Sequence, residues 1–243
     1  MSLALSSARS HPGKVRAQNE DALLERAAEG LWAVADGMGG HQEGARASRL
    51  VVERLAELAL GGSLDERLEQ VRRVLHEVNR RLTQDLTVLA DSAERLIGTT
   101  VVALLLADGE AACVWAGDSR AYLWRGNQLY QLTRDHSLLE RLVEVEGLTP
   151  QQATRHPSAR ALTRALGAQD ELALDIVRFE LLAGDRLLLS SDGLHGALEE
   201  RALGAALSLP TPTVALERLL DGVLQGPARD NLTAIVIHPL EAA

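Results

Sequence analysis

The stretch TTVVALLLADGEAACVWAG, residues 99–117, decides the fold class that we expect for this chain. Two apolar runs flank an Asp108-Gly109 pair, and such a pair is typical of a tight β-hairpin turn. A second hairpin is indicated where the tripeptide RGN (125–127) follows another apolar run. Strands joined by hairpins are antiparallel, so the pattern favours antiparallel sheets over a parallel, doubly wound sheet.

Similar patterns outside this stretch predict the remaining elements. Apolar, β-rich runs predict further strands at 31–36, 120–126, 172–181, 186–191 and 232–238. Apolar residues spaced by three or four predict helices at 43–60, 64–89, about 137–154 and 211–224. Ser63 and Glu66 form a capping-box signature at the start of the second helix. Because no repeat or linker divides the chain, we expect one α+β domain over residues 1–243, with antiparallel sheets covered by helices.

Composition excludes several functions. The chain carries 25 Lys and Arg against 34 Asp and Glu, a net charge of −9, which argues against nucleic acid or an anionic membrane as the main partner. Cys113 is the only cysteine, so an internal disulfide, a zinc finger and paired-thiol chemistry are excluded. There is no signal peptide and no apolar run of about 18 residues, so we expect a cytoplasmic protein without membrane insertion.

Three Asp-Gly pairs follow apolar runs, at Asp36, Asp108 and Asp192. After Asp108 the chain enters another strand at once, as a hairpin turn requires. After Asp36 and Asp192 it enters loops that lead into helical patterns. Hairpin geometry therefore explains only one of the three pairs.

A phosphate-binding loop is one alternative for the glycines that follow Asp36. A dinucleotide fingerprint would need glycine at positions 37, 39 and 42, but residue 42 is Gln42. A P-loop would need Gly-Lys followed by Ser or Thr, and this does not occur there. Nucleotide binding at this loop is therefore disfavoured.

A metal site is the other alternative, because further acidic residues border apolar runs. These residues are Glu20, Asp21, Asp118 and Asp230. Carboxylates gathered in a low-dielectric site repel one another and need cations, and hard oxygen ligands favour magnesium or manganese. Gly37 would let its carbonyl approach an ion, and the planar fork of Arg16 could hold two oxygens of a phosphate.

With these residues assembled, the sequence resembles the metal-dependent protein serine/threonine phosphatases of type 2C. The matching motifs occur in family order and are RAQNEDA (16–22), ADGMGG (35–40), GTT (98–100), GDSRAYL (117–123), LTRDHS (132–137), RALG (164–167), SDGL (191–194) and RDNLTAIVI (229–237). The resemblance implies two antiparallel sheets packed as a β-sandwich with helices on each side. It also implies a centre of two Mn²⁺ or Mg²⁺ ions at one end.

By motif position, the resemblance also assigns roles. Asp36 bridges the two ions and Gly37 contributes its carbonyl. Asp192 and Asp230 hold one ion, while Glu20 approaches the other through water. Asp21 and Asn231 orient these ligands from behind. Asp118 completes a third, weaker metal site with Asp192, and Arg16 binds the substrate phosphate.

The implied mechanism is in-line attack on phosphorus by a water that the two metals activate. The proton donor stays open: many animal members carry His directly after the first Asp-Gly, but this chain has Met38. His41 could donate, or it could be an ordinary loop residue while a metal-bound water donates. Residues 137–163 correspond to the flap beside the active site, which we expect to influence substrate choice.

The function that we expect is hydrolysis of phosphothreonine and phosphoserine in proteins, opposing a cytoplasmic or membrane-anchored bacterial serine/threonine kinase. A kinase that controls a secretion apparatus is one candidate among several. The rivals are a non-catalytic binding module, a phosphatase dedicated to one regulatory phosphoprotein, and a nucleic-acid phosphodiesterase. The filled ligand positions disfavour the first, the lack of room for a sensor domain disfavours the second, and the acidic balance disfavours the third.

Overall fold

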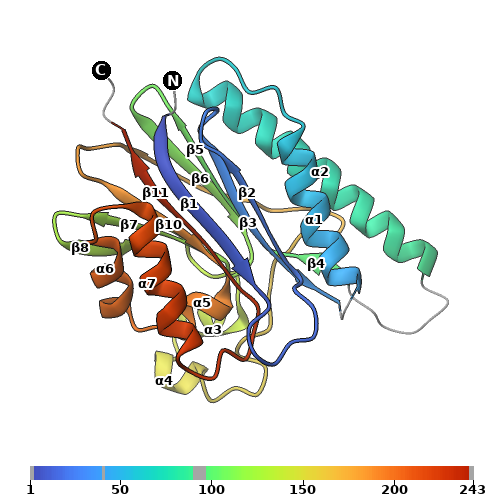
Figure 1. The fold of residues 1–243 in the computed structure, drawn as a ribbon. Coiled ribbons are helices and arrows are strands. Elements are labelled where there is room, and N and C mark those ends of the chain that lie inside the picture. Colours follow the sequence, from blue (N-terminus) through green and yellow to red (C-terminus); the bar gives the residue numbers. More distant parts are fainter. Residues whose placement is uncertain (1–2, 40–41, 90–96, 241–243) are drawn as a thin grey trace.

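The computed structural model, which describes residues 3–39, 42–89 and 97–240, contains two antiparallel sheets packed face to face between helices (Figure 1). One sheet has the order β1-β11-β10-β7-β8, and the other has the order β2-β3-β5-β6-β9, with a short β4 paired to β3. This arrangement confirms the α+β class and the antiparallel sandwich that the sequence predicts.

The elements have the following bounds. The first sheet contains β1 (Ala4–His11), β7 (Arg120–Arg125), β8 (Gln128–Gln131), β10 (Arg186–Ser190) and β11 (Leu232–Pro239). The second contains β2 (Asp21–Arg26), β3 (Leu31–Met38), β4 (Gly98–Thr99), β5 (Val101–Ala107), β6 (Glu110–Ala116) and β9 (Asp175–Glu180). The helices are α1 (Gln42–Ala56), α2 (Leu64–Leu89), α3 (Leu138–Glu144), α4 (Pro150–Ala153), α5 (Asp192–His195), α6 (Glu200–Leu207) and α7 (Pro212–Leu224).

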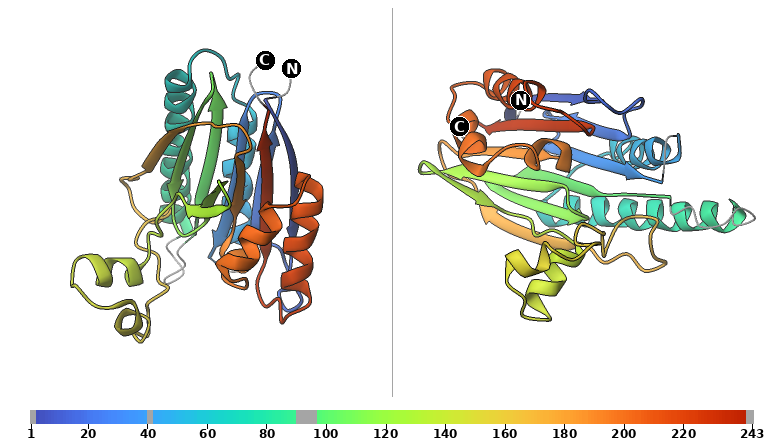
Figure 2. Two further views of the ribbon diagram at one scale, coloured as in Figure 1. Left: turned by 90° about the vertical axis from the view of Figure 1, so that its left-hand side faces the viewer. Right: turned by 90° about the horizontal axis from the view of Figure 1, so that it is seen from below.

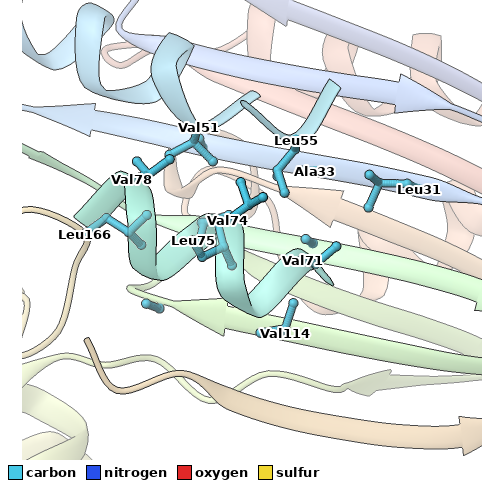
Figure 3. Close-up of a cluster of buried hydrophobic side chains, with 14 of the residues drawn as sticks. Leu31, Ala33, Val51, Leu55, Val71, Val74, Leu75, Val78, Val114 and Leu166 are labelled. Atoms are coloured by element: carbon cyan, nitrogen blue, oxygen red, sulfur yellow. The ribbon is translucent and has the colours of Figure 1, made fainter. Parts of the chain in front are cut away.

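Strand β3 shows how alternation along one strand builds two layers of core. Leu31, Ala33 and Ala35 face α1 and α2 and pack with the apolar stripes of those helices (Figure 3). Trp32 and Val34 point to the opposite side and belong to the core between the two sheets. A third apolar cluster lies between the other sheet and α6 and α7. The three clusters produce the helix–sheet–sheet–helix layering.

Both predicted hairpins are confirmed. Ala107 pairs with Glu110 across the β5–β6 turn, where Asp108 and Gly109 have φ values of 53° and 77°. The β7–β8 turn at 125–128 has the same left-handed pair of central residues. Positive φ at both central positions is what a two-residue hairpin with native twist requires.

Several predicted boundaries differ from the observed ones. Strand β3 continues beyond Asp36 to Met38, because Gly37 and Met38 pair with β4. The predicted helix at 137–154 is two short helices, α3 and α4, with Gly147 at a φ of 68° between them. The helix predicted at 43–60 is α1, which ends at Ala56. The sequence patterns give no bounds for β1, β2, α5 and α6, which the structure adds.

The flap, residues 137–163, projects from the sandwich with α3 and α4 (Figure 2). Its two ends are tied together by backbone pairing. Ser137 forms an isolated antiparallel bridge with Leu162, and the Leu138 amide donates to the Ala161 carbonyl at 2.8 Å. Among the described helices, none has the length and apolar character needed to span a bilayer.

Candidate active site

The acidic residues singled out by the sequence come from both sheets. Asp21 and Asp36 are register partners on β2 and β3. Asp192 is the first residue of α5, directly after β10, and Asp230 lies just before β11. Asp118 lies between β6 and β7. These strand ends meet at the end of the sandwich where α5 lies (Figure 1).

The charges of these acids act strongly on one another. Burial, followed by the charges of Asp21 and Asp192, raises the pKa of Asp36 well above its usual value. Burial and the charge of Asp230 raise the pKa of Asp192. Burial and the charge of Asp192 raise the pKa of Asp118 to about 7. A low-dielectric group of carboxyls with raised pKa values is an environment that cations stabilise.

The carboxylate of Asp21 accepts hydrogen bonds from two hydroxyl groups. The hydroxyls of Ser191 and Thr233 each donate to Asp21 Oδ2 at 2.7 Å, and the Thr233 amide donates to Ser191 Oγ. Burial raises the pKa of Asp21 to about 6, although these two hydrogen bonds act in the opposite direction. Its other oxygen, Oδ1, is buried without a hydrogen-bond partner among the described residues. Such an oxygen suits contact with an ordered water or a hydrated ion.

Asp36 is fixed by the two threonines of the GTT motif, to which the sequence alone assigns no role. Thr100 Oγ1 accepts from the Asp36 amide at 3.0 Å, and the Thr100 amide donates back to the Asp36 carbonyl at 2.8 Å. Thr99 Oγ1 also donates to that carbonyl. Ser119 Oγ, next to Asp118, lies 2.7 Å from Thr100 Oγ1. The motif order was the only signal for these residues.

Glu20 and Gly37 pack against the first turn of α1. The Gly37 amide donates to the Glu20 carbonyl at 3.1 Å, and Ser48 Oγ donates to the same carbonyl. A Cβ on Gly37 would lie 2.0 Å from the Gly44 carbonyl oxygen, and one on Gly44 would lie 2.7 Å from Glu20 Oε2. Both glycines are therefore required by the close approach of α1 to β3.

Asn231 joins the last strand to the β1–β2 loop. Its Oδ1 accepts from the Glu20 amide at 2.8 Å, and its Nδ2 donates to the carbonyls of Pro12 and Gln18 at 3.0 Å. Its own amide donates to Asp230 Oδ1 at 2.9 Å. This one amide side chain fixes the position of Glu20 relative to Asp230.

Arg16 lies at the edge of the acidic group. Its Nη2 donates to Asp230 Oδ2 at 2.9 Å, while 56% of the side chain stays exposed. Arg16 is therefore adjacent to the acids and still open to an anion arriving from solvent.

A pocket of about 560 Å³ opens beside the acids. Asp118, Asp192 and Asp230 line one side, and Ser137 and Arg160 of the flap line another. Arg160 acts on Asp192 and opposes the rise in its pKa. The pocket therefore has an anionic floor and a cationic contribution from the flap, and its volume lies in the range of small-molecule sites.

The base of the flap is attached to the strand end that carries Asp118. The Gly117 amide donates to His136 Nδ1 at 3.1 Å, so the ring proton is on Nε2, which contacts Asp175 Oδ2 at 3.1 Å. Arg164 Nη1 donates to Asp175 Oδ1 at 2.7 Å. The His136 ring also stacks on Trp115. His136, Asp175 and Arg164 together fix the base of the flap to the strand end.

His41 and His195 are two further histidines near the acidic motifs. His41 lies outside the described residues, so its candidacy as proton donor stays a prediction. His195 is buried in the pocket wall, where its Nδ1 lies 3.0 Å from Ser190 Oγ. Burial lowers the pKa of His195 to about 3, so its ring is neutral.

The donors present fit divalent metal ions. No three histidine, cysteine or acidic side chains in the described part of the chain are grouped as a ready-made ligand set. The fit rests instead on donor chemistry. The half-buried side chains are carboxyl groups with raised pKa values, and one buried oxygen of Asp21 has no hydrogen-bond partner among the residues that the structure describes. Oxygen-only ligands select Mg²⁺ or Mn²⁺ over softer metals.

The fold and this acidic centre define the class of the molecule. A family model described as "Protein phosphatase 2C" matches residues 10–231. The chain belongs to this family of protein phosphatases, which confirms the resemblance seen in the sequence.

Particular relatives support the same assignment. The serine/threonine protein phosphatase PstP of Mycobacterium tuberculosis is 37% identical over 94% of this chain, which spans 44% of the length of that relative. The solved structure of PppA, described as a key regulatory component of T6SS in Pseudomonas aeruginosa, is 37% identical with a TM-score of 0.89 over 98% of this chain and 99% of that chain. The PstP catalytic domain, solved in complex with 2 manganese ions, is 34% identical with a TM-score of 0.85 over 99% of this chain and 100% of that chain.

Proposed function

We propose that this chain is a metal-dependent phosphatase that hydrolyses phosphothreonine and phosphoserine in proteins. The observation that carries the proposal is the group of half-buried carboxyls with raised pKa values beside an open pocket and an exposed arginine. The family and the named relatives support the same reaction. Asp36, Asp192, Asp230, Glu20 and the Gly37 carbonyl would hold two Mn²⁺ or Mg²⁺ ions.

The two ions, when bound, would lower the pKa of a water so that it attacks phosphorus near neutral pH. The chain's own groups would bind the substrate phosphate and orient the acidic side chains. Arg16 would bind two phosphate oxygens and offset the charge that develops on them. The hydroxyls of Ser191 and Thr233 keep Asp21 turned toward the other acids. Asn231 holds Glu20 in place through its backbone amide.

Asp118 would hold a weaker third ion together with Asp192. Both line the pocket beside the flap, and the charge of Asp192 contributes to the raised pKa of Asp118. Ser119, the next residue, contacts Thr100, which fixes Asp36. A cation at Asp118 would therefore act at the boundary between the main centre and the flap.

The partners follow from the same proposal. We expect a cytoplasmic protein of one catalytic domain whose substrates are a serine/threonine kinase and that kinase's targets. A kinase linked to a secretion apparatus is supported by the likeness to PppA, which is described as a regulatory component of such an apparatus. The acidic balance supports neither nucleic acid nor an anionic membrane as substrate or partner.

The test is hydrolysis of a threonine-phosphorylated peptide with Mn²⁺, with chelator, and in the variants Asp36→Asn and Asp192→Asn. We expect turnover that needs the metal and falls at least about 100-fold in both variants. Asp108→Asn is the matched control, because Asp108 is the Asp-Gly aspartate of a hairpin and asparagine tolerates its φ of 53°. Undiminished turnover in both site variants would overturn the proposal. Absence of turnover in every condition would favour a binding module.

A further inference from the structure

A second hollow lies on the α1–α2 side of the molecule, away from the acidic pocket. It has a volume of about 250 Å³, and its lining residues are Gln42, Arg46, Arg49, Leu50, Glu53 and Arg81. All but Arg81 belong to α1, whose buried residues, including Ala47, Val51 and Leu55, face the sheet and α2. The hollow is thus rimmed by three guanidinium groups in a chain of net charge −9.

Arg49 and Arg81 differ from other arginines of the same two helices. Arg54 pairs with Glu77 at 3.8 Å, and Arg72 pairs with Glu69 at 2.8 Å. The side chains of Arg49 and Arg81 form no such ion pair within the described ranges, although both are exposed and border one hollow. Two like charges at one hollow repel each other, so an anion bound there would be stabilised by both.

The first turn of α1 connects the hollow to the candidate active site. Gly44, in the first turn of α1, abuts Glu20 and Gly37, and Gln42 of the same turn lines the hollow. Arg49 lies five residues beyond Gly44, which is about 8 Å along the helix axis. An extended peptide covers an axial separation of this size in about three residues, since each residue advances it by roughly 3.3 Å.

We propose that Arg49 and Arg81, with Arg46 beside them, bind a second phosphate group carried by the phosphoprotein substrate. Guanidinium groups bind phosphate through paired hydrogen bonds, which an ammonium group cannot offer in the same geometry. The enzyme would then prefer substrates that carry two phosphorylated residues. This inference rests on the proposed function, because the first phosphate is the one to be hydrolysed.

The experiment compares two peptides. Both carry one phosphothreonine, and one of them also carries a non-hydrolysable phosphonate residue roughly three to six positions away. We expect the phosphonate to lower KM by about three- to tenfold at unchanged kcat. The double variant Arg49→Gln/Arg81→Gln should lose this preference and keep its rate on the singly phosphorylated peptide. Arg73→Gln, which removes an exposed arginine of α2 outside the hollow, should keep the preference.

Equal KM values for the two peptides, or a preference that survives in the double variant, would overturn the proposal. Free inorganic phosphate is the other ligand that could bind to these arginines. If inorganic phosphate raises the Tm of the wild-type chain more than that of the double variant, while the peptides have equal KM values, the site binds the free anion and the substrate role is wrong.

Failure of the proposed function is distinguishable from failure of this inference. If no peptide is hydrolysed, binding of the fluorescently labelled phosphonate peptide to the wild-type chain and to the double variant still measures the site. Equal affinities would overturn the proposal, and an affinity about three- to tenfold weaker in the variant would support it.

Discussion

Asp21 and Asp36 stand directly opposite each other on the antiparallel pair of β2 and β3, so a buried and a half-buried carboxyl group leave the sheet on the same face. Like charges in this position are unfavourable in a strand pair. The chain keeps them there and supports Asp21 with two hydroxyl donors. The pair therefore costs the fold stability, and bound cations would offset that cost.

Metal binding should stabilise the fold more as the pH rises. The pKa values of Asp21 and Asp118, about 6 and about 7 in the folded chain, lie above their ordinary 3.8. Between pH 3.8 and about 7 the folded chain binds more protons than the unfolded chain. Without metal, its unfolding free energy therefore falls as the pH increases through this range. Cations cancel this loss. The Tm difference between Mn²⁺ and chelator should thus be larger near pH 8 than near pH 5, and a constant difference would contradict the prediction.

Arg16→Ala should reduce activity and leave stability nearly unchanged. The Arg16–Asp230 pair is exposed on both sides, and such pairs contribute less than about 1 kcal/mol to the free energy of unfolding. Loss of the phosphate-binding fork should lower kcat/KM for a phosphopeptide by about 10- to 1000-fold. Steady-state kinetics and a denaturant titration measure the two effects. A large fall in stability at normal kcat/KM would show that Arg16 is structural.

Gly37→Ala should disrupt the contact between β3 and α1. The added methyl group would lie 2.0 Å from the Gly44 carbonyl oxygen, so the first turn of α1 must move. We expect a loss of roughly 2–4 kcal/mol in unfolding free energy and weaker Mn²⁺ binding by calorimetry. Gly109→Ala is a useful comparison, because its Cβ meets no atom within 4 Å and any cost there comes from its φ of 77°. Equal Mn²⁺ affinity in Gly37→Ala and the wild-type chain would be inconsistent with a site at Gly37.

Asn231→Ala should loosen the β1–β2 loop. The change leaves the Glu20 amide and the carbonyls of Pro12 and Gln18 without their partner. Pro12 and Gln18 are exposed, so water can replace the amide at their carbonyls, and we expect a total loss of roughly 1–3 kcal/mol. Hydrogen exchange at the Glu20 amide should become faster. Protection equal to that of the wild-type chain would mean that Asn231 does not hold the loop.

Asp175→Asn should weaken the attachment of the flap without touching the acidic centre. Asp175 receives hydrogen bonds from His136 and Arg164, which lie at the two ends of the flap. We expect cleavage within residues 137–163 by a protease to become roughly two- to tenfold faster, with a higher KM for phosphopeptide. Asp170→Asn, an exposed change on the neighbouring loop, is the control. An unchanged rate of cleavage in Asp175→Asn would mean that backbone pairing alone holds the flap in place.

Much of the fold could be predicted because local signals agreed with it. The Asp108-Gly109 hairpin and the capping box at Ser63 are confirmed, with the Ser63 amide 2.8 Å from Glu66 Oε2. Apolar spacing that continues across Gly147 predicts one flap helix, whereas the positive φ of Gly147 separates α3 from α4. Strand β1 was not anticipated, because most of its residues are half-buried and its pattern does not alternate cleanly.

For the candidate site, the sequence indicated the acids but not their support. The pairing of Asp21 with Asp36 follows from strand register, which no local pattern near Glu20 reveals. The hydroxyl groups of Ser191 and Thr233 are common residue types whose role depends on contacts across more than 160 residues of sequence. Asp175 carried no signal, because a lone aspartate at a strand start is ordinary.

The hydrogen bond between the Glu20 amide and Asn231 joins positions 211 residues apart. Such a contact forms only after residue 231 has been made, since loop closure over that length must come first. During synthesis on the ribosome, the first strands and α1 can collapse while Asp230 has not yet been made. The acidic group is therefore assembled only when the segment with Asp230 and Asn231 has folded back onto the β1–β2 loop.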